Sequence, residues 1–238
     1  MAGKNVFRCK QFQIIQADHV HKVGTDGVLL GAWVYLQGCN RIIDVGTGTG
    51  LIALMLAQRS GQDTSITAIE PDVASFNLAK QNITQSTFRD RIKLFNSSLQ
   101  NFKTENSFDL VVCNPPFFEN SLKPPSMNRE RERHSTTLSY MDLINSSKVL
   151  LQPPGCLCIV IPITEGNRFI KLAVDSGFKL SRKCAVFSKE TKPQERWLLE
   201  FSMLSDGNPI EDTMFIMNSK GEWTEEYRLL TQNFYLNF

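Results

Sequence analysis

A glycine-rich turn that directly follows a short apolar run limits the folds open to this chain. Residues 41–45 (RIIDV) favour a β-strand, and residues 46–50 (GTGTG) come next. Residues 51–59 then place apolar side chains at helical spacing. Glycine lets the backbone reverse sharply and approach a ligand closely, as a strand–turn–helix unit at the end of a parallel sheet requires. The turn therefore predicts an α/β fold.

The pattern of strand followed by helix repeats along the chain, which is typical of βαβ units around a mostly parallel sheet. Further strands are expected at residues 65–70, 92–96, 108–113 and 156–161, and further helices at residues 72–85, 140–151 and 167–176. Two more β-rich runs, 178–188 and 197–204, are separated by a short polar connection. They predict an antiparallel hairpin at the edge of the sheet.

We expect one domain over residues 1–238, with a core at 41–204, an N-terminal extension at 1–40 and a tail with a helix at 205–238. In the extension, Thr25 is expected to cap a helix that runs to Trp33. The apolar side chains at Phe7, Phe12 and residues 14–15 are expected to cover the sheet. The extension as a whole is expected to cover a ligand site.

Composition restricts the class of protein. The chain has 26 Lys and Arg against 24 Asp and Glu, so a surface for nucleic acid must come from local clustering of charge. The six cysteines have no CxxC spacing, which predicts reduced thiols and no metal site. No apolar stretch reaches the roughly 18 residues that a membrane helix needs. We expect a cytoplasmic monomer with no membrane partner.

The glycine turn is the first candidate ligand site, because the helix that follows presents its positive N-terminal end. Dinucleotide enzymes share this pattern, and a tight turn needs glycines in any case. Glu70 ends the next expected strand, where a carboxylate can accept bonds from both ribose hydroxyls; it could also be a charge at a helix start. Asp44 either lies near the ligand or organises the loop. Ser98 and Leu99 are expected near an adenine.

A second motif, Asn114-Pro115-Pro116-Phe117, ends the strand expected at residues 108–113. An aromatic amine is a poor nucleophile because its lone pair is delocalised. Hydrogen bonds from its protons to Asn114 Oδ1 and the Pro115 carbonyl favour the reactive, pyramidal geometry. Pro116 stiffens the turn, and Phe117 offers a ring on which a flipped base can stack. The motif predicts methyl transfer to a planar nitrogen, with these four residues as the catalytic set.

Other candidates are less specific. The segment at residues 22–27 places a cation, a hydroxyl and a carboxylate before a helix, and it either closes over the cofactor or only begins the helix. Basic residues after the catalytic motif and in the expected hairpin could contact RNA phosphates, although acidic neighbours also suit a solvated loop. The RNA-binding candidates are Arg129, Arg131, Arg133, Lys189 and Lys192. The cofactor-binding candidates are Lys22, Thr25, Asp26, Asp44, Gly46, Thr47, Gly48, Gly50, Leu51, Glu70, Pro71, Ser98, Leu99 and Asn114.

With these motifs in view, the chain resembles class I S-adenosylmethionine-dependent methyltransferases, and more narrowly the bacterial tRNA1(Val) adenine-37 N6-methyltransferase family. The resemblance rests on residues 7–12, 22–33, 44–59, 114–118 and 229–236. It implies a Rossmann-like, seven-stranded, mostly parallel sheet with helices on both faces, and S-adenosyl-L-methionine as donor. It also implies N6-methylation of the adenosine beside the anticodon of a valine tRNA, with the anticodon stem-loop as partner.

Two residues depart from the family pattern. Phe117 stands where the family often has tyrosine, and it keeps the stacking face. Ser98 replaces an aspartate that is common near the cofactor adenine, so a modest loss of cofactor discrimination is expected.

Several alternatives use the same residues. Guanine N2 in rRNA and a glutamine side chain in a protein also present a planar NH2 to such a clamp. Only about forty residues precede the first core strand, too few for a separate helical domain that recognises a protein. A non-catalytic cofactor or RNA-binding module would not need Asn114, and a nicotinamide dehydrogenase would not need residues 114–117.

Overall fold

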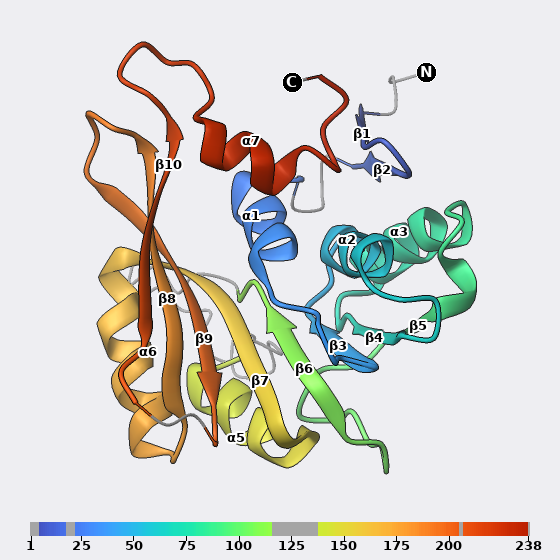
Figure 1. Ribbon diagram of the computed structural model, residues 1–238. Helices are drawn as coiled ribbons and strands as arrows, with labels where there is room; N and C mark the ends of the chain where they lie inside the picture. The colour runs from blue at the N-terminus through green and yellow to red at the C-terminus, as the bar shows by residue number, and fades with distance from the viewer. Residues whose placement is uncertain (1–4, 18–21, 116–137, 205–206, 238) are drawn as a thin grey trace, which may run out of the picture.

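The computed structural model describes residues 5–17, 22–115, 138–204 and 207–237. An eight-stranded sheet forms the centre, in the order β10-β8-β9-β7-β6-β3-β4-β5 (Figure 1). Its strands are β3 (Arg41–Val45), β4 (Ser65–Ile69), β5 (Ile92–Phe95), β6 (Phe108–Cys113), β7 (Leu151–Pro162), β8 (Lys179–Lys189), β9 (Gln194–Ser202) and β10 (Ile210–Met217). All neighbouring pairs are parallel except those that β9 makes with β7 and β8. The mostly parallel α/β sheet predicted from the sequence is therefore confirmed.

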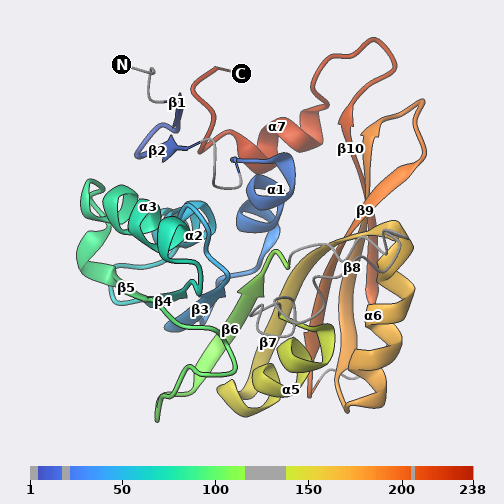
Figure 2. The same cartoon turned by 180° about the vertical axis from the view of Figure 1, so that it is seen from behind.

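Helices cover both faces of this sheet (Figures 1 and 2). They are α1 (Thr25–Trp33), α2 (Leu51–Arg59), α3 (Val73–Thr84), the 3-10 turn η1 (Arg89–Arg91), α5 (Tyr140–Leu150), α6 (Ile163–Asp175) and α7 (Glu225–Thr231). Successive strand residues enter opposite cores: Ile42 packs with the α1, α2, α3 and α7 layer, and Ile43 with the α5 and α6 layer. Burial on both faces explains why the strands are continuous apolar runs.

The edge of the sheet differs from the prediction. The β8–β9 hairpin forms, but β10 pairs in parallel with β8 and is the outermost strand. The predicted seven strands are thus joined by an eighth, in a segment expected to be tail. In β10 only Met214 and Ile216 are buried, and all four residues of its first half are exposed to solvent. That exposure gives Ile210–Met217 little of the apolar pattern of a core strand.

The N-terminal extension also differs. Strands β1 (Asn5–Arg8) and β2 (Gln13–Gln16) form a separate two-stranded sheet, and β2 packs against α3, so this segment does not lie directly on the central sheet. Thr25 is the first residue of α1 and not its cap; Gly24 holds the cap position without a side-chain hydrogen bond. Asp72, by contrast, caps α3 by accepting from Ser75 N. The two ends of the chain lie side by side, since Cys9 pairs with Tyr235 (Figures 1 and 2).

We predict that Phe169→Ala destabilises the protein strongly. Phe169 is fully buried on α6, and its ring centroid lies 5.2 Å from that of Tyr140 and 5.6 Å from that of Phe201. Removing a buried aromatic ring costs about 3–5 kcal/mol. Val174→Ala on the same helix, where the side chain is 49% exposed, should change the free energy of unfolding by less than about 1 kcal/mol. Urea denaturation of both variants tests this; equal losses would contradict the assignment of Phe169 to the core.

Candidate functional site

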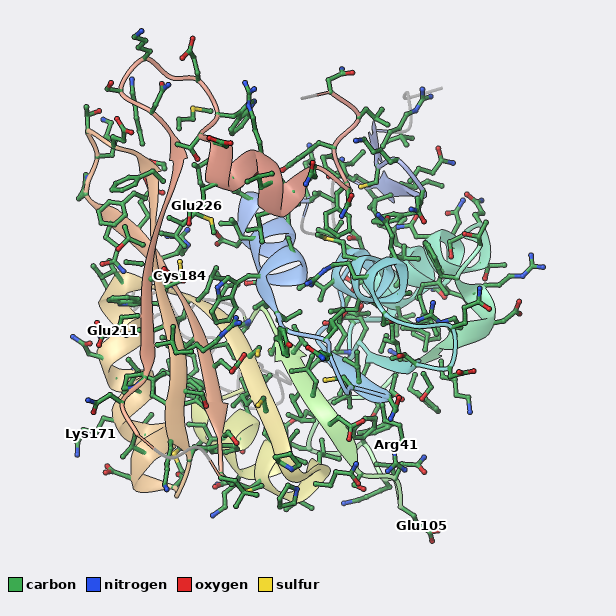
Figure 3. All side chains as sticks on the ribbon, viewed as in Figure 1. Arg41, Glu105, Lys171, Cys184, Glu211 and Glu226 are labelled. Atoms are coloured by element: carbon green, nitrogen blue, oxygen red, sulfur yellow. The ribbon has the colours of Figure 1, made fainter. Side chains whose placement is uncertain are left out.

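The site is built at the carboxyl ends of β3, β4 and β6. Val45, the last residue of β3, pairs with Ile69 on one side and with Cys113 on the other. The residues that follow these three are Gly46, Glu70 and Asn114, so sequence-distant candidates leave the sheet at one level. Arg41, at the amino end of β3, is labelled at the opposite, lower side of the molecule in Figure 3. The upper edge is thus where ligands of open parallel sheets bind.

The glycine turn reverses the chain between β3 and α2 in a conformation that glycine alone adopts easily. Gly46, Gly48 and Gly50 have φ angles of 70°, 58° and 82°. The Gly46 and Thr47 N–H groups donate to Ile69 O at 2.9 and 3.0 Å, and Gly50 N–H donates to Thr47 O at 2.9 Å. A Cβ added at Gly46 or Gly48 would meet no heavy atom of the described residues within 4 Å. The turn is rigidly held yet open on that side, which fits a small molecule lying against it.

Glu70 joins the turn to the next helix. Its side chain is largely buried, with one oxygen accepting from Gly48 N at 2.8 Å and the other from Asp72 N at 3.0 Å. Asn96 supports the same corner by donating from Nδ2 to the backbone oxygens of Glu70 and Pro71. The two interpretations of Glu70 are therefore not exclusive, because the carboxylate touches both the start of α3 and the turn where a ribose would lie.

Asp44 lies beneath the turn and is fully buried. Its Oδ2 accepts from Thr47 Oγ1 at 2.5 Å and from Ala53 N at 3.1 Å, whereas its buried Oδ1 has no hydrogen-bond partner among the described residues. Burial raises the pKa of this carboxyl to about 7; the two hydrogen bonds oppose the rise, and the Glu70 charge adds to it. The structure thus supports the loop-organising role of Asp44 and leaves one polar atom that a ligand or water could satisfy.

The segment before α1 lies beside the turn. α1 crosses α2 closely, since a Cβ added at Gly27 would lie 3.1 Å from Leu51 Cδ2. Asp26 is paired with Arg196 of β9, with 2.9 Å between Oδ2 and Nε. Thr25 belongs to the first turn of α1 and Lys22 to the segment before it. These residues lie at the same edge of the sheet as the glycine turn. The contact that the structure shows for the Asp26 carboxylate, however, is with Arg196.

The adenine-side candidates follow β5. Ser98 and Leu99 are both buried, and Leu99 packs in the same core cluster as Val45 and Ile69. The Ser98 carbonyl accepts from Asn101 N and Phe102 N and so shapes the connection to β6. This tight backbone turn therefore fixes where Ser98 and Leu99 lie at this end of the candidate site.

Of the catalytic motif, Asn114 and Pro115 are described, half-buried and buried respectively, directly after β6. Pro116, Phe117, Arg129, Arg131 and Arg133 lie outside the described residues. Lys189 ends β8 and Lys192 lies in the β8–β9 connection. Because β8 runs parallel to β10 and antiparallel to β9, and β9 antiparallel to β7, both lysines lie at the same edge of the sheet as Asn114.

Sequence reasoning missed two contributors to this edge, Asn82 and Asn96, and it considered Arg196 only as a basic residue of the hairpin connection, without its partner Asp26. Asn82 is buried on α3 and contacts the glycine turn, Asn96 supports Glu70, and Arg196 holds Asp26. A polar side chain on the buried face of a predicted helix is the signal that could have drawn attention to Asn82. The other two contacts depend on which strands become neighbours, which local sequence does not show.

Metal binding has no visible basis in the described ranges, where no group of three or more His, Cys, Asp or Glu is placed to hold an ion. Among the helices in those ranges, none has the length and hydropathy needed to cross a membrane.

Comparison with known proteins places this geometry in context. Residues 28–179 match the family model "Methyltransferase small domain". The chain is 39% identical over 230 residues to a tRNA1(Val) (adenine(37)-N6)-methyltransferase of Vibrio campbellii, covering 97% of this chain and 95% of the relative.

Two solved structures share the fold. One is a predicted O-methyltransferase from Agrobacterium tumefaciens, with a TM-score of 0.65 and 15% identity over 88% of this chain and 96% of that one. The other is the glycopeptide N-methyltransferase MtfA complexed with S-adenosyl-L-methionine, with a TM-score of 0.55 and 14% identity over 78% of this chain and 90% of that one. The Rossmann-like methyltransferase fold expected from the sequence is thereby confirmed.

We predict that Asp44→Asn changes how stability depends on pH. The pKa of Asp44 rises from 3.8 to about 7 on folding, so between these values the folded state holds a proton that the unfolded state releases. This group therefore makes the protein less stable as pH rises from about 4 to about 7. The free energy of unfolding of Asp44→Asn should increase relative to wild type between pH 5 and pH 7 and level off above pH 8.

Urea denaturation at several pH values measures that difference. Asp142→Asn is the matched control, because the Ser139 hydroxyl lowers the pKa of the Asp142 carboxyl and the group stays ionised in both states above pH 5. Its difference from wild type should be flat over this range. A flat difference for Asp44→Asn as well would contradict the raised pKa.

Proposed function

The chain belongs to the tRNA1(Val) (adenine(37)-N6)-methyltransferase family, and on this premise we propose that it transfers a methyl group from S-adenosylmethionine to N6 of adenosine 37 in a valine tRNA. It is an S-adenosylmethionine-dependent methyltransferase by family and by fold. One observation carries the site assignment: the glycine turn, Glu70 and Asn114 leave three neighbouring strands at one level of the sheet.

The turn side of this edge fits the donor. The open faces of Gly46 and Gly48 allow the cofactor to approach the backbone, and Glu70 is placed to accept from its ribose hydroxyls. Ser98 and Leu99 would border its adenine, and the unpartnered Asp44 Oδ1 is a further acceptor beneath the turn. When bound, S-adenosylmethionine supplies an electrophilic methyl group on a positively charged sulfur.

The β6 side of the edge fits the acceptor. Asn114 Oδ1 and the Pro115 carbonyl would accept the two protons of the adenine N6 amine, holding its nitrogen toward the donor. In the reaction the N6 lone pair would form a bond to the methyl carbon as the carbon–sulfur bond of the bound donor breaks and leaves neutral S-adenosylhomocysteine. The N6 nitrogen would then lose one of its two protons to water. Acceptors fixed before the reaction stabilise the positive charge that develops on nitrogen. Phe117 would stack on the flipped base.

RNA contacts are proposed for the basic residues around this edge. Lys189 and Lys192 rise from the β8–β9 connection on the site's side of the sheet. Arg129, Arg131 and Arg133 follow the catalytic motif in the sequence. Phosphate contacts of this kind position a nucleic acid without reading its bases. The reaction needs one chain and a cytoplasmic RNA, so we propose a cytoplasmic monomer.

Methyl transfer tests the proposal directly. The protein is incubated with labelled S-adenosylmethionine and unmodified total tRNA, with rRNA and protein extract as parallel acceptors, and the methylated product is identified. N6-methyladenosine in valine tRNA supports the proposal. Label only in rRNA or in glutamine of a protein keeps the amine chemistry and replaces the substrate, whereas no label despite cofactor binding favours a binding module.

We predict that Asn114→Ala removes turnover and spares cofactor binding. Loss of a fixed acceptor at the reacting group should lower kcat by at least about a hundredfold. The dissociation constant for S-adenosylhomocysteine, measured by calorimetry, should change by less than about threefold, because the turn and Glu70 remain intact. Asn101→Ala, an exposed asparagine beyond β5, is the matched control and should behave as wild type. Unchanged turnover in Asn114→Ala would sink the amine-clamp mechanism.

A further inference from the structure

A buried side chain on α3 connects the N-terminal hairpin to the glycine turn. Asn82 is 1% exposed and makes three hydrogen bonds. Its Oδ1 accepts from Ile15 N at 2.9 Å, and its Nδ2 donates to Ile15 O at 3.1 Å and to Thr49 O at 2.9 Å. Ile15 lies in β2, and Thr49 lies between two glycines of the turn. One carboxamide thus joins segments that are more than thirty residues apart in the sequence.

The contact with β2 resembles strand pairing. Asn82 accepts from the N–H and donates to the C=O of the same residue, as a residue of a third, antiparallel strand does in a hydrogen-bonded pair. The contact with Thr49 fixes a peptide group of the turn from the α3 side. Gly50, whose N–H follows that carbonyl, packs against Ile83 and Ala79 of the same helix, with a virtual Cβ 3.5–3.7 Å from them.

The hairpin is held firmly enough to act as a support. The C-terminal tail packs against its outer side. There Lys10 N donates to Phe234 O, and the Phe7 and Tyr235 rings pack edge to face with their centroids 6.0 Å apart. On its inner side Gln16 Oε1 accepts from Val23 N at 2.8 Å, in the segment that leads into α1. Figures 1 and 2 both show the hairpin between the C-terminal tail and the α2–α3 layer.

We propose that Asn82 is a positioning residue for the cofactor, coupling the N-terminal hairpin to the shape of the glycine turn. The inference rests on the proposed function only in placing S-adenosylmethionine at that turn. Since Asn82 holds Thr49 O, the turn keeps the conformation in which Gly46 and Gly48 face open space. Cofactor binding and hairpin stability are then linked, and by reciprocity each strengthens the other.

The physical reason lies in satisfaction of buried polar groups. Without the carboxamide, the carbonyls of Thr49 and Ile15 and the N–H of Ile15 lose partners in a site closed to water, so the turn and the hairpin relax toward other conformations. A cofactor that needs one conformation of the turn must then restore that conformation on binding. Its apparent dissociation constant rises in inverse proportion to the fraction of molecules whose turn already has that conformation. The chemical step, which depends on Asn114, is untouched once the cofactor is bound.

Kinetics of Asn82→Ala separate this role from general support of the fold. We expect the KM for S-adenosylmethionine to rise about tenfold, and kcat at saturating donor to stay within about twofold of wild type. Asn82→Asp keeps the acceptor for Ile15 N but turns an oxygen toward two carbonyls, so its KM should rise at least as far. A role in stability alone would lower the active fraction of either variant and leave KM unchanged.

Gln152→Ala is the matched control. Gln152 is also a side-chain amide with three polar partners, Arg41, Ser107 and Asp109, but these lie at the amino edge of the sheet, where Figure 3 labels Arg41. It should lose stability while keeping the wild-type KM for S-adenosylmethionine. An equal rise of KM in Gln152→Ala would overturn the specific role of Asn82.

Amide hydrogen exchange provides a second test, and its first measurement uses the wild-type protein alone. Saturating S-adenosylhomocysteine should slow exchange in residues 13–16 at least about threefold, and Asn82→Ala should abolish that slowing. Exchange in the hairpin that is indifferent to S-adenosylhomocysteine would refute the coupling. Failure of the wild type to bind S-adenosylhomocysteine at all would instead refute the proposed function, so the two failures are distinguishable.

Discussion

The hydrogen bonds of the buried Asp44 carboxylate are the interaction on which the rest of the site depends. One oxygen binds Thr47 of the turn and Ala53 of α2, so a single residue of β3 fixes the strand, the turn and the first turn of the helix together. A carboxylate with no exposure is costly to hold, as the rise of its pKa to about 7 shows. That cost is tolerable because the glycines that follow need an anchor. Glycine adopts positive and negative φ angles about equally readily, so the sequence of the turn does not by itself select the positive φ angles that the structure shows.

The turn is then enclosed from three directions, each using a different physical effect. On the sheet side, Ile69 O and Glu70 receive N–H groups of the turn. On the α1 side, the absence of a side chain at Gly27 lets α1 approach α2 so closely that a Cβ at this position would lie 3.1 Å from Leu51 Cδ2. On the α3 side, Asn82 supplies a polar contact inside an apolar layer. Among the described residues, the face over Gly46 and Gly48 is left open, and it is the face to which we assign the cofactor.

Much of this could be predicted from the sequence because its determinants are local. The strand 41–45, the turn and the helix 51–59 are defined by apolar spacing and glycine, and Glu70 and Asn114 follow strands that are themselves apolar runs. Other features depend on partners distant in sequence. Residues 210–217 form a strand because β8 offers an edge, although their own pattern is largely exposed. Asn82 is a polar residue on the buried face of α3, so the sequence signals that it has buried partners but does not show which segments supply them.

The reversed direction of β9 keeps the β8–β9 connection, with Lys189 and Lys192, at the edge of the sheet where Asn114 lies, in a chain whose net charge is only +2. β8 runs toward the same edge as β6 and β7, and because β9 returns antiparallel, their connection remains at that edge. A parallel β9 would have required a crossover and would have carried residues 190–193 away from Asn114. The start of β9 is also linked to α1 by the ion pair between Arg196 and Asp26, and neither side chain is fully exposed. Topology therefore brings these two lysines to the same edge of the sheet as Asn114, which overall composition does not predict.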